Sequence, residues 1–310
     1  MANNTFDFYD KTTLKSYNLD KAMRYQLDML DRLDVFTRKH SENVATLTCR
    51  LCEKLRCTKG FTEYCTICAY LHDIGKLFIP PEILQKPGKL TDEEYEIMKT
   101  HTTLGYNICM EDLKLRPYAA GPLYHHEALD GSGYPKGLTK KDIPIEGQII
   151  RVADEYDAIV SKRQYKSHIG ISDTLKILIN NTKPNINTLS KIAINSKYGK
   201  DNPLIVRKLL KVVIEDIEYE IFSTQSYITS LKKDLKRMEQ IKKAKHSMDK
   251  AKKEKDKSYY LEYIKALLKT DEKVENIENL YEEYQNALTT RKNIIENLYH
   301  EISVIKKLKV

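Results

Sequence analysis

The scarcity of helix breakers is the feature that most restricts the fold of this 310-residue chain. The chain contains 11 Gly and 9 Pro, and long stretches between them lack both residues. Several of these stretches repeat apolar residues every three or four positions, which is the spacing of one face of an α-helix. No segment before Phe222 indicates a sheet. The sequence therefore predicts an all-α fold, either one sizeable domain with an extension or two domains.

The distribution of Gly, Pro and apolar residues divides the chain into three parts. Residues 1–36 form an N-terminal segment with an amphipathic helix over Tyr17–Asp34, and residues 37–222 form the main domain. Residues 223–310 are long helices without Gly or Pro. A coiled-coil seam runs along their last helix, with one polar interruption. It consists of Ile277, Leu280, Tyr284, Ala287, Arg291, Ile294, Leu298, Ile302 and Ile305.

An earlier helix can pair antiparallel with this seam. It carries Leu231, Leu235, Met238 and Ile241, and the chain would turn at a break near 255–258 or near 270–273. We interpret 223–310 as a helical hairpin or a dimerisation arm, through which a homodimer could form. Residues 231–310 also hold 20 Lys and Arg against 14 Asp and Glu, a surplus of 6 within the net charge of +8. Because acids are interleaved throughout, we expect a solvated helical face and no binding of a nucleic acid polymer.

The six cysteines include two Cys-x-x-Cys pairs, which superficially match a zinc site. Both pairs, Cys49 with Cys52 and Cys65 with Cys68, lie in segments with helical periodicity and without turn residues. We therefore expect them to pack in the core as free thiols. The first residues, MANNTFDFYD, lack the features of an export signal, and no run of 18 apolar residues occurs. These observations predict a cytoplasmic protein without a membrane span.

Within the main domain, helices are expected at about 37–57 and 62–77, which carry the cysteines. Thr91 is a good N-cap for a helix that continues through His101. A helix over 115–130 would end in the glycine-rich turn that follows His125 and His126.

Five of the eight histidines lie in short clusters that also contain acids. The clusters are His40, His72-Asp73, His101 and His125-His126, followed by Asp154 and Asp157. Imidazole and carboxylate together suit zinc, iron, manganese or nickel, and one carboxylate can bridge two cations. An isolated histidine such as His40 is also compatible with a simple hydrogen-bonded role. The His72-Asp73 pair is more informative, because it places a charge inside the apolar run AYLHDIGK.

In this order the clusters resemble the motifs of the HD phosphohydrolase superfamily. LHDIGK (71–76) is similar to its HD motif, and HHEALDGSGYPKGL (125–138) is similar to the motif that defines the HD-GYP subgroup. HSENVA, HTTLGYNI, RVADEYDAI and RQYK match the remaining elements, so that the resemblance spans about 37–215. It implies a helical bundle that hydrolyses cyclic di-GMP to pGpG or GMP at a cluster of metals.

The resemblance also implies roles for individual residues. Asp73 would bridge two divalent cations, iron or manganese first and zinc, nickel or cobalt next, which hold the attacking hydroxide. Lys76, Arg163 and Lys166 match positions that contact phosphate, and Tyr134 could line the base pocket or merely shape its loop. The implied metal ligands are His40, His72, Asp73, His101, His125, His126 and Asp154.

Two positions depart from the family pattern. Members with a third metal carry a glutamate where this chain has Phe36, which favours a binuclear site here, although Asp34 could substitute. Gln164 stands where proline is more common, which should alter a turn.

Several matters stay open at this point. The chain could instead be a sensor or scaffold that binds the nucleotide and signals through its C-terminal helices, or a phosphodiesterase for another cyclic dinucleotide. The metal, the final product and the regulatory input are not specified by the sequence.

Overall fold

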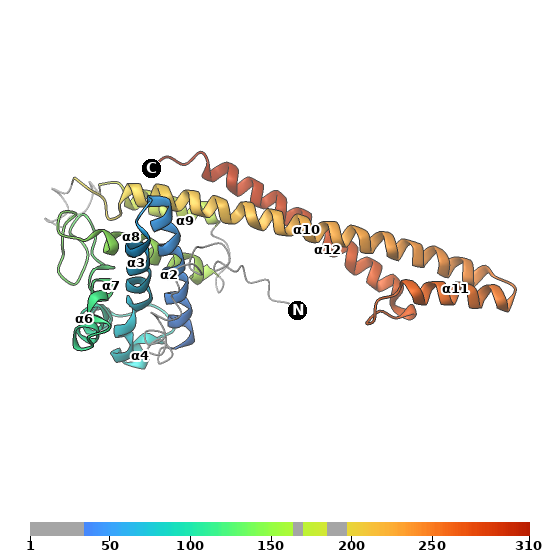
Figure 1. Cartoon of the computed structure of the whole chain (residues 1–310), viewed down its shortest axis with the longest axis horizontal. Helices are drawn as coiled ribbons and strands as arrows, with labels where there is room; N and C mark the ends of the chain where they lie inside the picture. The colour runs from blue at the N-terminus through green and yellow to red at the C-terminus, as the bar shows by residue number, and fades with distance from the viewer. Residues whose placement is uncertain (1–33, 164–169, 185–196) are drawn as a thin grey trace. The chain divides into compact units, whose positions relative to one another are not determined.

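The computed structural model describes residues 34–163, 170–184 and 197–310, and most of these residues are helical (Figure 1). Within these ranges there is no strand, only an isolated bridge between Asp130 and Thr139. The all-α prediction is confirmed. The helix expected over Tyr17–Asp34, the residues Gln164 and Lys166, and the segment 185–196 lie outside the described residues.

The chain forms two compact units. The first contains the chain up to Ile214 together with Val304–Val310, and the second contains Glu215–Ser303. The domain limits after residues 36 and 222 stay predictions. No helix in the described ranges combines the length and the hydropathy that crossing a bilayer requires.

Helices α2 (Val35–Leu55) and α3 (Lys59–Leu71) form the centre of the first unit. Asp34 caps α2 by accepting hydrogen bonds from the backbone N–H groups of Phe36 and Thr37, both at 3.1 Å. Arg56 ends the helix in the left-handed conformation, with φ 62°. The four thiols of the two Cys-x-x-Cys pairs are free and fully buried, which confirms their packing role.

Three expected helix boundaries are wrong. The helix predicted over 62–77 ends at Leu71, and a 3-10 helix, η3 (Ile74–Phe78), follows His72 and Asp73. The helix predicted over 115–130 is a 3-10 turn, η4 (Arg116–Tyr118), and a short α7 (Ala120–Tyr124), because prolines interrupt its backbone hydrogen bonding. The helix through His101 is two helices that meet at Thr100, α5 (Asp92–Lys99) and α6 (His101–Glu111).

The Thr91 cap is confirmed. Its hydroxyl accepts a hydrogen bond from the Glu94 backbone N–H, and the Glu94 carboxylate accepts one from the Thr91 backbone N–H. The short α4 (Pro81–Leu84) precedes this cap.

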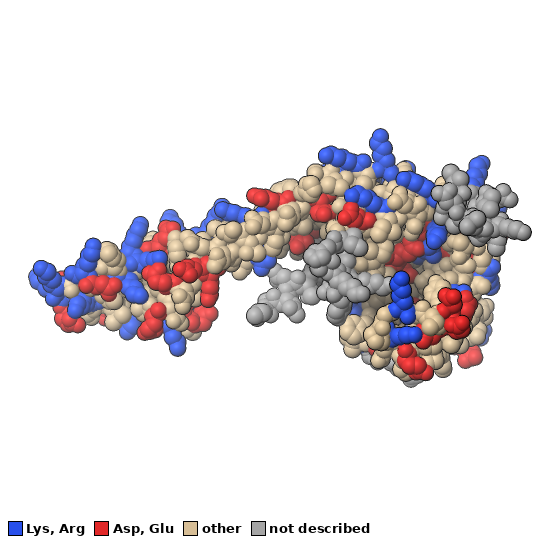
Figure 2. All heavy atoms as spheres, turned by 180° about the vertical axis from the view of Figure 1, so that it is seen from behind, with Lys and Arg blue, Asp and Glu red and all other residues tan. Residues whose placement is uncertain are grey.

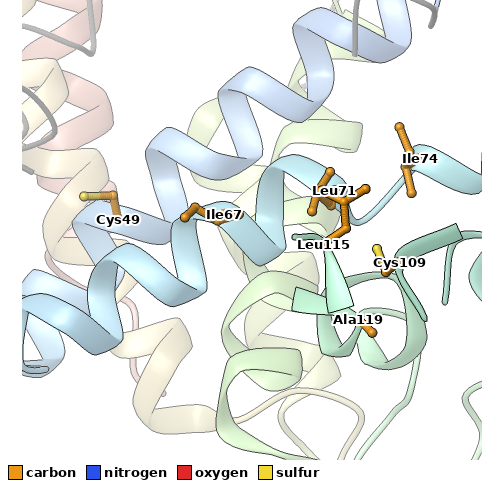
Figure 3. Close-up of a cluster of buried hydrophobic side chains, with 7 residues drawn as sticks. All are labelled: Cys49, Ile67, Leu71, Ile74, Cys109, Leu115 and Ala119. Carbon is orange, nitrogen blue, oxygen red and sulfur yellow. The ribbon is translucent and has the colours of Figure 1, made fainter. Parts of the chain in front are cut away.

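The first unit contains a buried apolar cluster (Figure 3). It joins α2 and α3 to η3 and to the segment from α6 to α7, which also pack directly on one another. The remaining elements of this unit are α8 (Ile145–Arg163), α9 (Ile171–Asn181) and the start of α10 (Pro203–Lys250). The members of the cluster are Cys49, Ile67, Leu71, Ile74, Cys109, Leu115 and Ala119.

The second unit is a helical hairpin with a core of its own. Met238 and Ile241 of α10 pack with Ile264 of α11 (Glu254–Leu267) and Ile277 of α12 (Ile277–Ile305). The chain reverses direction between α10, which ends at Lys250, and α11, which begins at Glu254. A second interruption at 268–273 separates α11 from α12, at the break predicted near 270–273. The alternative break at 255–258 is wrong, because α11 covers those residues.

The pairing of α10 with α12 is antiparallel, as predicted. Along α10 the contacts advance from Gln225 to Lys242, while their partners on α12 run backwards. Arg291, the polar interruption of the seam, lies 5.3 Å from the centre of the Tyr227 ring. Acidic and basic side chains alternate over these helices (Figure 2). The pairs along the hairpin are Gln225 with Tyr299, Tyr227 with Arg291, Glu239 with Tyr281, and Lys242 with Glu278.

Candidate metal centre

The structure brings the seven expected ligands together from separate parts of the first unit. His40 comes from the second turn of α2, and Asp154 from the middle of α8. The other five lie at helix ends: His72 and Asp73 follow α3, His101 begins α6, and His125 and His126 follow α7. Helix ends suit this purpose because their last carbonyl groups lack partners within the helix.

Three of the histidines use those free carbonyl groups in the same way. Nδ1 lies 2.6 Å from the Ala69 carbonyl oxygen in His72, and 2.6 Å from the Met98 oxygen in His101. In His125 it lies 2.9 Å from the Pro122 oxygen. Because a carbonyl oxygen can only accept, Nδ1 carries the proton in all three rings. Each Nε2 therefore presents a lone pair to the centre, which is the state that a metal ligand requires.

His40 is held by carboxylates instead. Its Nδ1 lies 2.7 Å from Asp157 Oδ2, and its Nε2 lies 2.9 Å from Asp154 Oδ1. Asp157 therefore orients the ring. Burial opposes the protonation of His40, but the two aspartates outweigh it and raise the pKa of the imidazole to about 10.

Asp73 lies at the centre of the cluster. Its Oδ2 accepts a hydrogen bond from Lys76 Nζ at 2.5 Å, and its Oδ1 is 3.4 Å from His101 Nε2. Its Oδ2 is also 3.3 Å from His72 Nε2. Burial alone would raise the pKa of this carboxyl group, but the positive charge of Lys76, followed by the contacts with His72 and His101, holds it well below its usual range. Asp73 is thus an anion with histidines on both sides of it.

Three of the other histidines, His101, His125 and His126, are neutral. Burial lowers the pKa of His101 and His125, and it lowers the pKa of His126 to about 3. Asp154 lies 4.0 Å from His126 Nδ1, and its carboxyl group has a pKa below the usual range because the neighbouring histidines outweigh burial. Neutral imidazoles beside ionised carboxylates form the donor set that a divalent transition metal takes.

One atom tests whether this donor set fits a cation. His72 Nε2 is completely buried and has no hydrogen-bond partner in the described part of the chain. A buried lone pair without a partner is unfavourable unless something else occupies it. The site can therefore hold divalent cations on three groups of residues. Within each group, the ligand atoms lie within 4.8 Å of one another. The groups are His101, His125 and His126; His40, His72 and Asp73; and His72, His125 and Asp154.

A cavity of about 920 Å³ opens onto the ligands. Lys76 lies in its wall beside Asp73, and so does the exposed ring of Phe36. Asp34 also lines it, but its Oδ1 accepts the two backbone hydrogen bonds of the α2 cap and its Oδ2 accepts the Thr37 hydroxyl at 2.5 Å. Both oxygens serve the helix end, so Asp34 is poorly suited to replace a third-metal ligand. Sequence reasoning missed the apolar part of the wall, which no motif marks: Leu84, Met98 and Ala158.

The glycine-rich loop is held by the carboxylates of Glu127 and Asp130. Buried Glu127 accepts the backbone N–H groups of Lys136 and Leu138, both at 2.7 Å. Asp130 accepts the backbone N–H of Ser132 at 3.0 Å. These bonds hold the loop across the residues that follow His126.

The structure also places the expected substrate-binding residues, as far as it describes them. Tyr134 stacks on His126 with the ring centres 4.6 Å apart. Arg163 is the last residue of α8, and Lys166 lies beyond the described part of that segment. Lys76 and Tyr134 are thus beside the ligands, whereas the roles of Arg163 and Lys166 stay predictions.

The chain is similar in sequence to known proteins of one family. A family model described as HD domain matches residues 24–186. A cyclic di-GMP phosphodiesterase of Thermotoga maritima is 47% identical over 144 residues, which are 46% of this chain and 39% of the relative. The cyclic di-GMP phosphodiesterase response regulator RpfG of Xanthomonas campestris is 42% identical over 116 residues, 37% of this chain and 31% of the relative.

A further relative carries a different substrate in its name. The 3'3'-cGAMP-specific phosphodiesterase 1 of Vibrio cholerae is 33% identical over 160 residues, 49% of this chain and 35% of the relative. In each case the chain spans well under half the length of the curated relative.

Proposed function

Since this chain belongs to the HD-domain family, with the motifs of its HD-GYP subgroup, we propose that it is a metal-dependent phosphodiesterase that hydrolyses cyclic di-GMP to pGpG or GMP. The observation that carries the proposal is the convergence of five imidazoles and two carboxylates beside one cavity, which four of them line. The names of two relatives supply the substrate. We place the activity in the cytoplasm.

The ligand set favours two divalent cations, with iron or manganese first. Asp73 is the residue best placed to serve both, because its two oxygens face different histidines. Such cations would supply Lewis acidity, neutralising phosphate charge and lowering the pKa of a water molecule. Phe36 and the engaged carboxylate of Asp34 argue against a third cation.

The protein's own residues have separate tasks in this proposal. His72, His101 and His125 present fixed lone pairs, so that the donor atoms need no rearrangement. Lys76 lies where it can move from Asp73 to a phosphate oxygen of the substrate. Tyr134 is stacked on His126, which lines the cavity, and in this proposal its ring contacts the nucleotide base.

A second substrate deserves a direct test because one relative is named for 3'3'-cGAMP. Protein purified without oxygen would be analysed for metals and then incubated with cyclic di-GMP or 3'3'-cGAMP, with nucleotide chromatography as the readout. We expect faster cleavage of cyclic di-GMP. Binding without cleavage of either nucleotide would favour the sensor alternative and contradict the proposal.

Replacement of Asp73 provides the decisive variant. Asp73→Ala should lose bound metal and turnover together, because it removes the carboxylate shared by the histidines on both sides. The matched control is Asp173→Ala, since Asp173 also pairs with a lysine three residues later but on the surface. Near-normal turnover in Asp73→Ala, measured beside this control, would exclude the mechanism.

A further inference from the structure

Arg151 is a buried cation that links the metal centre to the start of α10. It lies on α8, one turn before Asp154, and is 8% exposed. Its Nε donates to Asp201 Oδ1 at 2.9 Å, and its two terminal nitrogens donate to the His126 carbonyl oxygen at 3.4 Å and to Glu155. One guanidinium thus contacts three different parts of the chain.

The His126 carbonyl receives a second hydrogen bond from the loop itself. The backbone N–H of Tyr134 donates to it at 3.2 Å. The ring of the same Tyr134 stacks on the His126 ring, whose Nδ1 lies 4.0 Å from Asp154. The orientation of the His126 peptide therefore determines where its imidazole lies, and Arg151 is the side chain from outside the loop that holds this peptide.

Asp201 anchors the other side of Arg151. It is 1% exposed and lies two residues before Pro203, where α10 begins. Its backbone N–H donates to the Asn181 carbonyl oxygen at 3.2 Å, at the end of α9. The neighbouring Lys200 carbonyl accepts the backbone N–H of Leu129 at 2.9 Å. The segment before α10 is thus bound both to the end of α9 and to the glycine-rich loop.

The chemistry of this contact needs an arginine. A guanidinium has five N–H donors in a planar fork and can serve two carboxylates and a carbonyl at once. A lysine ammonium could pair with Asp201 or Glu155 but could not also hold the His126 peptide in the same plane. Burying such a charge is unfavourable unless it is paired and hydrogen-bonded, and Asp201, Glu155 and the His126 carbonyl group supply these partners.

We propose that Arg151, anchored by Asp201, is a positioning residue that holds His126 in the orientation required for metal binding and turnover. The inference deepens the proposed function and rests on it for the turnover step, whereas the metal-binding step can be measured without substrate. Arg151 contacts no ligand atom of the metal centre directly and acts through the peptide of His126.

The test compares two buried arginines. Arg151→Lys keeps the charge and removes the fork. Arg50→Lys is the matched control, because Arg50 is also buried, at 4% exposed, and donates to a backbone carbonyl, that of Val212 at 3.3 Å. Both full-length variants would be titrated with Mn²⁺ against a chromophoric chelator, melted, and assayed with cyclic di-GMP.

We expect Arg151→Lys to weaken Mn²⁺ binding about 10-fold or more, the scale at which residues that orient metal ligands act. Its kcat should fall by a similar factor while its KM changes little. Arg50→Lys should keep wild-type Mn²⁺ affinity and kcat, even if its melting temperature falls by as much as that of Arg151→Lys. Wild-type Mn²⁺ affinity in Arg151→Lys, or an equal loss in Arg50→Lys, would overturn the proposal.

A second variant tests the anchor. Asp201→Asn should weaken Mn²⁺ binding in the same direction, and the double variant should bind no more weakly than Arg151→Lys alone, because both changes break one chain of contacts. Additive losses would overturn the role of Asp201. If the wild type binds Mn²⁺ but leaves cyclic di-GMP intact, the proposed function fails while the Mn²⁺ affinities still decide the role of Arg151.

Discussion

Burial decides what an acid-lysine pair does in this protein, as two pairs of identical spacing illustrate. Asp73 and Lys76 are 2.5 Å apart, with side chains 2% and 21% exposed. Asp173 and Lys176 are 2.7 Å apart, with side chains 52% and 49% exposed. Water and salt screen the second pair, so it contributes little to stability. The first lies at the wall of the cavity, where its charges act on whatever enters.

Lys76→Ala should therefore separate metal binding from turnover. The variant should keep its metal, because the ligands remain, and should lose about 10²-fold in kcat, the usual effect of removing one electrostatic stabiliser from an active site. Metal analysis and steady-state kinetics with cyclic di-GMP measure the two effects. Lys176→Ala serves as the control. Unchanged kinetics in Lys76→Ala would show that Lys76 has no role in turnover.

At this scale the sequence predicted residue types better than contacts. The motifs around His72 and His125 led to the cluster of histidines and aspartates that the structure assembles. The hydrogen bonds of His72 and His101 to the carbonyl groups of Ala69 and Met98 were not predictable, because a backbone oxygen carries no sequence signal. Arg151 was visible in RVADEYDAI, but its partner Asp201 lies 50 residues further along the chain.

Among the elements, the 3-10 helix η3 brings the HD motif against α6. Gly75 lies at the point of closest approach: a Cβ there would be 1.9 Å from the His101 carbonyl oxygen and 2.5 Å from the Gly105 nitrogen. Both atoms belong to the backbone, so the two segments would have to separate. The position of His101 relative to Asp73 therefore depends on the absence of a side chain at residue 75.

Gly75→Ala should displace His101 from Asp73 and so reduce the amount of bound metal and the kcat at least 10-fold, since ligand geometry tolerates little displacement. Gly60→Ala is the control, because a Cβ at Gly60 would meet nothing within 4 Å. Metal analysis at matched protein concentrations provides the readout. Full metal occupancy in Gly75→Ala would mean that the contact is not required.

Helix boundaries were the least predictable part of the fold. The apolar spacing of an α-helix continues through residues 72–77, and Ile74 is fully buried although it lies in a 3-10 helix. The spacing alone therefore does not show where α3 ends. What ends α3 is tertiary, namely the packing of η3 on α6 around Gly75. By contrast, the cap at Thr91 uses only residues within one turn, and the sequence was sufficient to predict it.

At the scale of the whole molecule, each unit has its own core and its own buried ion pairs. In the second unit, Arg237 of α10 contacts both oxygens of Glu272, at 2.5 Å and 2.7 Å. Glu272 also accepts the Tyr284 hydroxyl at 3.0 Å. These hydrogen bonds, that of Arg237 first, lower the pKa of Glu272 from 4.5 to about 2. The segment between α11 and α12 is thus held to α10 by a carboxylate that is more acidic in the folded state than in the unfolded chain.

The stabilisation by Glu272 should depend on pH in a defined direction. A carboxyl group with a depressed pKa in the folded state stabilises that state above its unfolded pKa, about 4.5, and loses this effect as the pH falls through about 2. Melting curves of the wild type and Glu272→Gln should therefore differ most near pH 6 and converge towards pH 2. Glu254→Gln, in an exposed pair with Lys257, should leave the curve unchanged at any pH. A difference that grows on acidification would contradict the assignment.

The division of the chain was predictable in kind but not in detail. The seam from Ile277 to Ile305 and the helix with Met238 predicted the hairpin, because each is amphipathic along its whole length. The extent of α10 was not predictable, since no Gly or Pro separates the residues of the first unit from those of the second within Pro203–Lys250. Gly and Pro mark a boundary between units only where the backbone changes direction, and α10 continues across this one.

The three histidines that donate Nδ1 to the preceding turn have a consequence for how a cation is captured. Their rings lose rotational and tautomeric freedom when the helices form, so this entropy is lost during folding and not at the moment of binding. A preorganised cage of this kind can retain a scarce ion at low concentration. It also discriminates by shape, since an ion that requires a different arrangement of donors would have to unwind three helix ends to obtain it.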